Sequence, residues 1–337
     1  MTEIYLVTGG TGYVGSFVVL QLLEAGKTVK TTIRNLAKEA QFRKSLVDSS
    51  EKLTTKDVET QLTVYKADLL SDDGWEEAFK DVTYVLHVAS PFPSSVPSDP
   101  QVLIKPAKEG TLRILKWAKA TPTVKHVVIT SSFAAIGFGF PDDRTTPYSE
   151  KDWTVVENVQ HSPYVVSKTL AEQSAWYFAK NEDVKYGLSV INPALIIGPS
   201  LKGQVTDSTS LFRIKSLVDG SLKDGVAPSS THLVDVRDIA KLHIEALTNP
   251  KANGERFLAH SGPNLSFLEA GEILRKSNIP ESLKKNIPTK ELEGAKQSAK
   301  PCDISKAKAA FDWTPIPNEV SLVATVEGLI ADGQLKV

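Results

Sequence analysis

The sequence of 337 residues lacks several features that would point to particular functions. A single cysteine, Cys302, excludes an intrachain disulfide, which fits a reducing compartment. A net charge of −1 without a long basic run gives no electrostatic attraction to nucleic acid or anionic lipid. No apolar run reaches the roughly 18 residues that cross a bilayer, and Glu3 stands where a secretory signal peptide would need positive charge. We therefore expect a cytoplasmic protein without nucleic-acid or membrane partners.

What the chain does have is the composition of an ordinary globular protein, with 41% hydrophobic and 23% charged residues. Short runs rich in Val and Ile alternate with amphipathic segments of helical length through its first half. We expect strands at 4–8, 28–33, 62–66, 83–88, 124–130 and 186–191, with helices between them at 13–25, 37–47, 106–120 and 163–180. Such alternation is typical of a parallel sheet covered on both faces, so the sequence predicts an α/β fold with a doubly wound parallel sheet.

A glycine cluster directly follows the first predicted strand. Residues 9–15, Gly-Gly-Thr-Gly-Tyr-Val-Gly, fit both Gly-x-Gly-x-x-Gly and Gly-x-x-Gly-x-x-Gly. Glycines allow a tight turn and let backbone N–H groups approach a pyrophosphate, and the last glycine lets helix and strand pack closely. The alternative is a tight turn without a ligand. At the first strand-to-helix turn, however, the cluster favours a dinucleotide site made by Gly9, Thr11, Gly12, Tyr13, Val14 and Gly15.

The end of the second predicted strand indicates which dinucleotide binds. An NAD site places Asp or Glu about 20 residues beyond the glycines, where it binds the ribose 2′-hydroxyl. Here Arg34 ends the strand and Lys38 follows four residues later. A guanidinium binds a 2′-phosphate in a bidentate manner, whereas a carboxylate would repel it. We expect NADP (NADPH) as the cofactor, the alternative being that both cations are merely solvated surface charges.

Three side chains are candidates for catalysis. Tyr164 is the only tyrosine with a lysine, Lys168, four residues later, which places both on one face of the predicted helix. A phenol with a pKa of about 10 needs a nearby cation to exchange protons near neutral pH. Ser132 follows the fifth predicted strand, so its hydroxyl is expected at the crevice where parallel sheets bind ligands. Together the three predict an acid–base site.

These motifs resemble the extended short-chain dehydrogenase/reductase superfamily, and within it the branch of dihydroflavonol reductase, cinnamoyl-CoA reductase and yeast methylglyoxal (carbonyl) reductase. The resemblance spans nearly the whole chain. Its landmarks are Thr8-Gly9-x-x-Gly12-x-x-Gly15, Ala67-Asp68-Leu69, His87-Val88-Ala89-Ser90-Pro91-Phe92, Thr130-Ser131-Ser132, Tyr164-x-x-Ser167-Lys168, Asn192-Pro193-x-x-x-x-Gly198-Pro199, Val234-Asp235-Val236-Arg237-Asp238 and Asp312-Trp313-Thr314-Pro315.

The resemblance implies roles for these residues. Tyr164 would protonate the carbonyl oxygen, Lys168 would lower the Tyr164 pKa and bind the nicotinamide ribose, and Ser132 would orient the substrate oxygen. The remaining cofactor contacts that it implies are Asp68 and Leu69 at the adenine, Ala89 and Ser90 at the ribose and pyrophosphate, and Pro193 and Leu195 at the nicotinamide. One departure is that residues 106–120 contain no Asn, which other short-chain enzymes use on that helix.

The regular alternation of strands and helices loosens after Pro193, and this change divides the chain. We expect an NADP-binding domain at 1–195, to which 226–248 return, and a smaller substrate-binding domain formed by 196–225 and 249–337. Two aromatic residues, Phe92 and Phe133, are expected to present their rings to a small-molecule carbonyl substrate, although ordinary core packing is an equal alternative. Exposed helices could pair, so both a monomer and a homodimer stay open.

The sequence therefore favours an NADPH-dependent reductase of aldehydes or ketones, such as aryl or alkyl aldehydes, ketoesters or dihydroflavonol-like compounds. No metal is expected, because the six histidines show no ligand spacing. One alternative is a sugar-nucleotide epimerase or dehydratase, and another is an enzyme like 3β-hydroxysteroid dehydrogenase. Phe133-Ala134 follow Ser132, where such dehydratases have an Asp-Glu pair. The non-enzymatic alternative is an NADP-binding redox regulator, which would need the glycines but not the Tyr164/Lys168 pair.

Overall fold

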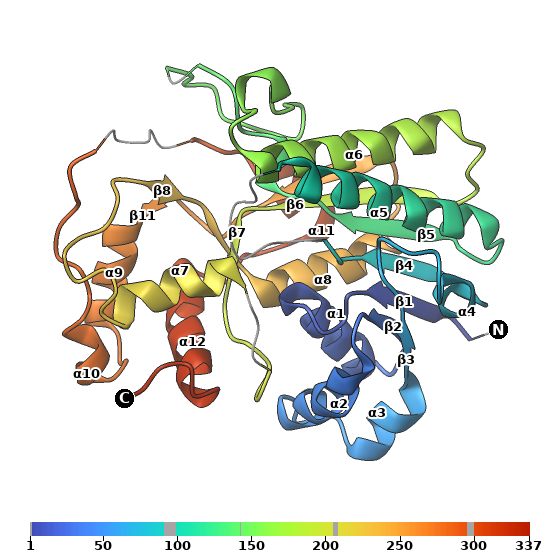
Figure 1. Cartoon of the computed structure of the whole chain (residues 1–337), viewed down its shortest axis with the longest axis horizontal. Helices are drawn as coiled ribbons and strands as arrows, with labels where there is room; N and C mark the ends of the chain where they lie inside the picture. Colours follow the sequence, from blue (N-terminus) through green and yellow to red (C-terminus); the bar gives the residue numbers. More distant parts are fainter. Residues whose placement is uncertain (1, 91–98, 142, 205–207, 295–299) are drawn as a thin grey trace.

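The computed structural model describes residues 2–90, 99–141, 143–204, 208–294 and 300–337. Its centre is a seven-stranded sheet, parallel throughout, in the order β10-β6-β5-β4-β1-β2-β3 (Figure 1). The strands are β1 (Ile4–Thr8), β2 (Thr28–Ile33), β3 (Leu62–Lys66), β4 (Tyr84–His87), β5 (His126–Thr130), β6 (Gly187–Pro193) and β10 (Glu255–Ala259). This arrangement confirms the predicted doubly wound parallel sheet.

Helices cover both faces of the sheet (Figure 1). Leu6 and Val7 of β1 point to opposite sides, and each is fully buried in a different hydrophobic core. One core contains α4 (Trp75–Phe79), α5 (Gln101–Ala120) and α6 (Pro163–Asn181). The other contains α1 (Tyr13–Glu24), α2 (Glu39–Asp48), α3 (Thr55–Gln61), α8 (Val236–Ala246) and α11 (Ser305–Phe311). Strands buried on both faces explain the continuous Val- and Ile-rich runs of the sequence.

A smaller group of elements lies to the left of the sheet in Figure 1 and has its own core. Its helices are α7 (Thr209–Val218), α9 (Phe267–Lys276), α10 (Glu281–Lys284) and α12 (Asn318–Ala331). Two short sheets accompany them, β7 (Leu195–Ile197) with β9 (Leu233–Asp235), and β8 (Ser230–Thr231) with β11 (Leu265–Ser266). Single turns of 3-10 helix occur at η1 (Leu36–Lys38), η2 (Phe133–Ala135) and η3 (Val156–Asn158).

Three features differ from the sequence-based expectations. Helix α5 begins at Gln101 rather than at Pro106, so Pro106 lies inside the helix, where it loses one hydrogen bond and crowds the carbonyl four residues earlier. Burial of Leu103 and Ala107 offsets this cost. Neither α3 nor α11 was expected. Strand β10 lies in the large sheet beside β6, although residues 249–337 were assigned to the smaller domain. The division into two domains stays a prediction. Strand β10 shows that the large sheet includes residues outside the predicted NADP-binding domain of 1–195 and 226–248.

The strand order indicates where a ligand would bind. From β1 the chain adds β2 and β3 on one side and then β4, β5 and β6 on the other, and parallel α/β sheets bind ligands outside the carboxyl ends of the strands at such a switch point. Among the described residues, no helix combines the length and the apolar character needed to span a membrane.

Candidate active site

The turn between β1 and α1 tolerates only glycine at its key positions. Gly9 has a φ of +72°, and its N–H donates to the carbonyl of Thr32 at 3.1 Å. A Cβ on Gly10 would lie 2.1 Å from Thr31 Oγ1, and one on Gly15 would lie 2.3 Å from the Gly9 carbonyl oxygen. The chain is thus packed so closely that helix α1 starts directly against β2 and the turn itself.

This turn leaves the positive end of α1 open. Gly12 occupies the N-cap, no side chain caps the helix, and the first turn contains no acidic residue. Gly12 is exposed and Thr11 is partly exposed, whereas the Thr11 carbonyl accepts a hydrogen bond from Gln204 Nε2 at 2.7 Å. An anion at this helix end would meet backbone N–H groups and a favourable dipole. The cradle therefore fits the pyrophosphate of a dinucleotide.

Two residues of the predicted cradle use their side chains elsewhere. The Tyr13 hydroxyl donates to the carbonyl of Gly198 at 2.8 Å and ties α1 to the segment after β7. Val14 is buried in the core. At both positions only the backbone is left to face a phosphate.

The tip of β2 carries the two predicted cations. Arg34 and Lys38 are both exposed, and neither takes part in an ion pair with another described residue. Between them, the Asn35 side chain caps the short helix η1. Two cations that form no ion pair with the described residues, at a strand end where Arg34 stands in place of an acid, suit a phosphate group better than a ribose hydroxyl pair.

The other predicted cofactor residues line the neighbouring strand ends. Ala89 donates its N–H to Thr8 Oγ1 at 3.1 Å, and its Cβ would lie 3.0 Å from a Cβ on Gly9, so it borders the glycine turn. Ser90 follows it and is partly buried. Asp68 Oδ1 accepts from the N–H of Leu70 at 2.9 Å, and Leu69 packs against α5 at Gly110. Pro193 ends β6, and Leu195 begins β7. Their contacts with a cofactor stay predictions.

The three candidate catalytic side chains converge on the carboxyl end of β5. The Tyr164 hydroxyl donates to Ser132 Oγ over 3.5 Å, a long hydrogen bond, and Ser132 Oγ also accepts from the N–H of Ala134 at 3.1 Å. One helical turn on, Lys168 Nζ donates to the carbonyl of Thr130 at 3.3 Å. Tyr164 and Lys168 therefore reach positions two residues apart on the same strand end.

Burial governs the protonation of this group. It raises the pKa of the Tyr164 phenol above its ordinary value, and the hydrogen bond to Ser132 opposes only part of this rise. The net shift is upward because desolvation dominates, and a lowering of this pKa by Lys168 stays a prediction. Burial also lowers the pKa of Lys168 to about 8, against the pull of the Glu172 carboxylate, which raises it.

A buried polar network beneath the site was not predicted from the sequence. Glu172 is 1% exposed, and its two oxygens accept from Ser131 Oγ at 2.5 Å, Asn192 Nδ2 at 2.7 Å and Arg256 Nε at 2.7 Å. Asn192 Nδ2 is also 3.2 Å from the carbonyl of Ser132. Glu172 stands four residues after Lys168 on α6, a spacing that would have indicated it. No local signal indicates Arg256, which comes from β10.

His87 is a structural histidine beside the site. Its Nδ1 lies 2.9 Å from Thr8 Oγ1, whose oxygen also accepts from the N–H groups of Val88 and Ala89. Burial lowers its pKa to about 3, and the Lys168 charge acts in the same direction. It stays neutral near physiological pH and holds the end of β4 against β1.

The predicted substrate residues have different outcomes. Phe92 lies outside the described residues. The Phe133 ring lies 5.7 Å from that of Phe138 and 6.0 Å from that of Tyr148, edge to face in the second case. Its packing partners are therefore aromatic, and its contact with a substrate stays a prediction.

Known protein sequences are similar to this chain over most of its length. The sequence profile of the NAD dependent epimerase/dehydratase family matches residues 5–259. Cinnamoyl-CoA reductase CAD2 of Medicago truncatula is 34% identical over 344 residues, which cover 97% of this chain and 95% of that protein. The bifunctional dihydroflavonol 4-reductase/flavanone 4-reductase of Malus domestica is 32% identical over 317 residues, covering 91% and 84%.

Solved structures include a close match to the fold. Yeast methylglyoxal/isovaleraldehyde reductase Gre2, complexed with NADPH, has a TM-score of 0.84 and 25% identity, and the match covers 99% of this chain and 100% of that chain. The similarity therefore includes both the large sheet and the smaller group of elements.

Proposed function

Because the chain belongs to the NAD dependent epimerase/dehydratase family, we propose that it is an NADPH-dependent oxidoreductase that reduces the carbonyl group of aldehydes or ketones. The resemblance to the reductase branch of the extended short-chain superfamily is confirmed by its relatives, two of which are a cinnamoyl-CoA reductase and a dihydroflavonol 4-reductase. The observation that carries the proposal for this chain is the convergence of Ser132, Tyr164 and Lys168 on one strand end beside the glycine turn.

The cofactor would lie across the carboxyl ends of the strands. The pyrophosphate would meet the backbone of residues 11–15, where α1 begins without a capping side chain. Arg34 and Lys38 would hold the 2′-phosphate that distinguishes NADPH from NADH. When bound, the reduced nicotinamide supplies the hydride. The structural relative Gre2 was solved with NADPH, which supports this choice.

The protein's own residues would handle the proton. The raised pKa keeps the Tyr164 phenol protonated at neutral pH, which is the form a proton donor needs in the reductive direction. Ser132 Oγ, which now accepts the Tyr164 hydrogen bond, would donate instead to the substrate oxygen and hold it near the phenol. The ammonium of Lys168 would stabilise the phenolate that remains after the proton leaves.

The substrate class is proposed from the chemistry around Ser132. Phe133 directly follows the proposed catalytic serine, and its ring packs with those of Phe138 and Tyr148. An apolar wall suits aryl or alkyl aldehydes, ketoesters and dihydroflavonol-like compounds better than it suits sugar nucleotides.

The proposal is tested by the change Tyr164→Phe. NADPH oxidation with an aromatic aldehyde should fall by at least about 100-fold, the lower end of the contribution of general acid catalysis. NADPH binding, followed by the change in its fluorescence, should persist. The matched control is Tyr177→Phe, the same change on the same helix at a side chain that is 72% exposed.

Equal turnover of Tyr164→Phe and wild type would rule out the proposed acid. Wild-type activity should be screened on aldehydes, ketoesters, dihydroflavonols and UDP-sugars. Conversion of UDP-sugars alone, without net NADPH consumption, would instead support an epimerase.

A further inference from the structure

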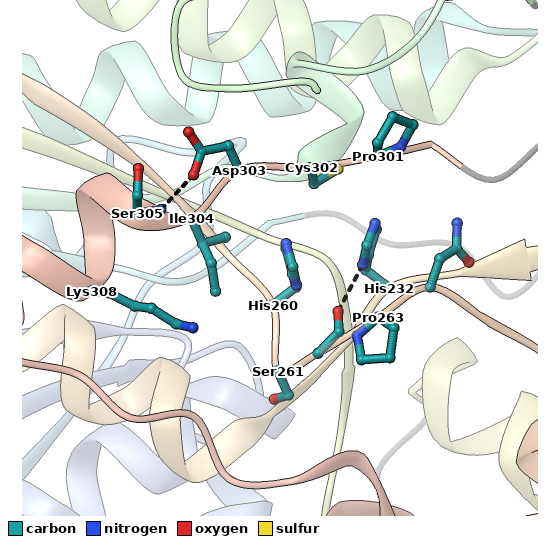
Figure 2. A pocket seen from close by; sticks show the side chains of 12 residues that line it. His232, His260, Ser261, Pro263, Pro301, Cys302, Asp303, Ile304, Ser305 and Lys308 are labelled. Atoms are coloured by element: carbon teal, nitrogen blue, oxygen red, sulfur yellow. Dashed lines mark hydrogen bonds between the residues drawn. The ribbon is translucent and has the colours of Figure 1, made fainter. Parts of the chain in front are cut away.

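Two histidines and the single cysteine meet outside the proposed catalytic set (Figure 2). One ligand atom from each of His232, His260 and Cys302 lies within 4.8 Å of the other two. The three come from distant segments: His232 directly precedes β9, His260 directly follows β10, and Cys302 lies shortly before α11. The proposed reaction uses none of them.

His260 has a buried imidazole with poorly placed hydrogen-bond partners. The residue is 6% exposed, and neither of its ring nitrogens makes a well-formed hydrogen bond with a described residue, although the backbones of Gly262 and Cys302 lie nearby. A buried polar ring whose hydrogen-bond partners are poorly placed costs free energy and calls for an explanation. A neutral imidazole has one N–H and one nitrogen lone pair, and the lone pair can bind an ion.

His232 faces an acceptor on each side. Its Nδ1 lies 3.1 Å from the carbonyl oxygen of Gly262, and its Nε2 lies 2.8 Å from that of Lys300. A neutral imidazole has one N–H, so it can satisfy only one of these carbonyls. Histidines that bind metals have one nitrogen on the ion and donate the other N–H to a carbonyl or carboxylate. Its position suits that division of roles.

Cys302 completes the set and faces a cavity. Its thiol donates to the Lys300 carbonyl at 3.3 Å, and burial raises its pKa to about 12, so it is not a thiolate by itself. The cavity has a volume of about 560 Å³, and its walls include all three residues as well as Asp303 and Lys308. These two opposite charges leave the wall without a strong net charge, and there is room for water.

We propose that His232, His260 and Cys302 bind one divalent cation of the zinc class, with water from the cavity as the fourth ligand. Two imidazoles and one thiolate are ligands that zinc prefers. Tetrahedral bonds of zinc to nitrogen and sulfur place such ligand atoms about 3.5 Å apart, so side-chain rotation must bring them closer by about 1 Å. The rings of His232 and His260 lie with their centroids 4.1 Å apart and their planes 33° apart, so one ring must also turn until both in-plane lone pairs point at the ion. On binding, the Cys302 S–H bond breaks, its proton passes to solvent, and a sulfur–metal bond forms.

The ion would cross-link three segments that are far apart in the sequence. His260 follows Ala259, which pairs with Pro193 in the sheet, so the site would anchor the strand ends beside the catalytic crevice. The spacing of these residues in the sequence gives no sign of the site, because the ligands are 28 and 42 residues apart and meet only in the fold. The proposal does not depend on the proposed reaction.

Cobalt provides the test, because Co²⁺ takes zinc sites and reports thiolate ligation in its absorption spectrum. Tag-free protein, treated with a chelator and then dialysed, is titrated with CoCl₂ under reducing conditions. We expect one Co²⁺ per chain, with a thiolate-to-cobalt band in the near ultraviolet and visible bands of tetrahedral cobalt. ZnCl₂ should abolish both and should raise the midpoint of thermal unfolding.

The variants separate the cluster from the rest of the chain. Cys302→Ser should lose the thiolate band, and His260→Asn should weaken Co²⁺ binding at least tenfold. His161→Asn, a change at an exposed histidine outside the cluster, should bind as wild type does. A wild-type spectrum without a thiolate band overturns the proposal whether or not the variants fold. So does binding that Cys302→Ser and His260→Asn leave unchanged, because the ion would then be elsewhere.

Discussion

The buried ion pair beneath the active site makes the most demanding prediction. The side chains of Glu172 and Arg256 are 0% and 9% exposed, with Oε1 and Nε 2.7 Å apart. The Arg256 guanidinium also donates to the carbonyls of Glu150 and Asp152 and lies 3.6 Å from the centre of the Trp153 ring. Glu172→Gln removes the negative charge and leaves this guanidinium buried without a counter-ion.

The hydrogen bonds of Glu172 show why glutamine is a poor substitute. Oε1 accepts from Arg256 and from Trp176 Nε1, while Oε2 accepts from Ser131 and Asn192. A glutamine must place its NH₂ group on one side, where it faces either the guanidinium or the Asn192 amide. Both arrangements put donor against donor, so hydrogen bonds are lost in addition to the charge.

The expected loss of stability follows from these contacts. Breaking a buried pair by removing one partner costs about 3–5 kcal/mol. With an unfolding entropy of about 2.1 cal/mol/K per residue over the 337 residues, that loss lowers the unfolding midpoint by about 4–7 °C. Circular dichroism during heating measures it. Glu182→Gln breaks the exposed pair with Lys119 and should leave the midpoint close to that of wild type.

A double variant gives the refutation. Because a buried ion pair is often replaceable by apolar side chains, Glu172→Leu with Arg256→Met should recover part of the stability lost in Glu172→Gln. A midpoint within 1 °C of wild type for Glu172→Gln, or a double variant less stable than either single change, would refute the reasoning.

Three further predictions concern the proposed site. The pKa of Lys168 is about 8, so kcat/KM for carbonyl reduction should fall above about pH 8 as the amine loses its charge. In Glu172→Gln the fall should begin at lower pH, because the carboxylate that raises the Lys168 pKa is gone. A flat pH–rate profile would contradict this prediction. Arg34→Ala should raise the Kd for NADPH by roughly 10- to 100-fold, which corresponds to the loss of one charge-assisted hydrogen bond, and should leave the Kd for NADH unchanged. Both constants are measured by fluorescence. Equal effects on the two would disprove that Arg34 selects NADPH over NADH. Gly15→Ala places a Cβ 2.3 Å from the Gly9 carbonyl oxygen. The change should lower the free energy of unfolding by about 1–3 kcal/mol in a urea titration and should weaken NADPH binding. An unaltered stability and an unaltered Kd would contradict the prediction and mean that the turn can relax.

Much of the fold was predictable because its signals are local. Strands buried on both faces need continuous apolar runs. For β1, β2 and β3 the predicted bounds therefore agree with those of the structure. The errors arose where tertiary packing outweighed local preference. Pro106 is a typical first residue of a helix, yet burial of Leu103 extends α5 toward the N-terminus.

The candidate site was predictable to the extent that its residues share one element. Tyr164 and Lys168 stand at helical spacing, and Ser132 follows a recognisable strand, so their convergence could be expected. The direction of the Tyr164 pKa shift could not, because it depends on how much solvent the fold excludes. The partner of Glu172 was equally hidden, because Arg256 lies 84 residues away.

Arg256 also ties the catalytic helix to a late part of the chain. Strand β10 brings this guanidinium under α6, where it meets Glu172, and Glu172 in turn contacts Ser131 and Asn192. Asn192 donates to the carbonyl of Ser132, so the position of the proposed catalytic serine depends on a strand that enters the sheet more than 120 residues later in the sequence. Asn192 contacts Ser132, and Glu172 stands on the helix that carries Tyr164 and Lys168. We therefore expect the proposed active site to be complete only after β10 has paired with β6. Residues 1–195 alone should therefore retain the glycine turn but lack an ordered Ser132–Tyr164 pair.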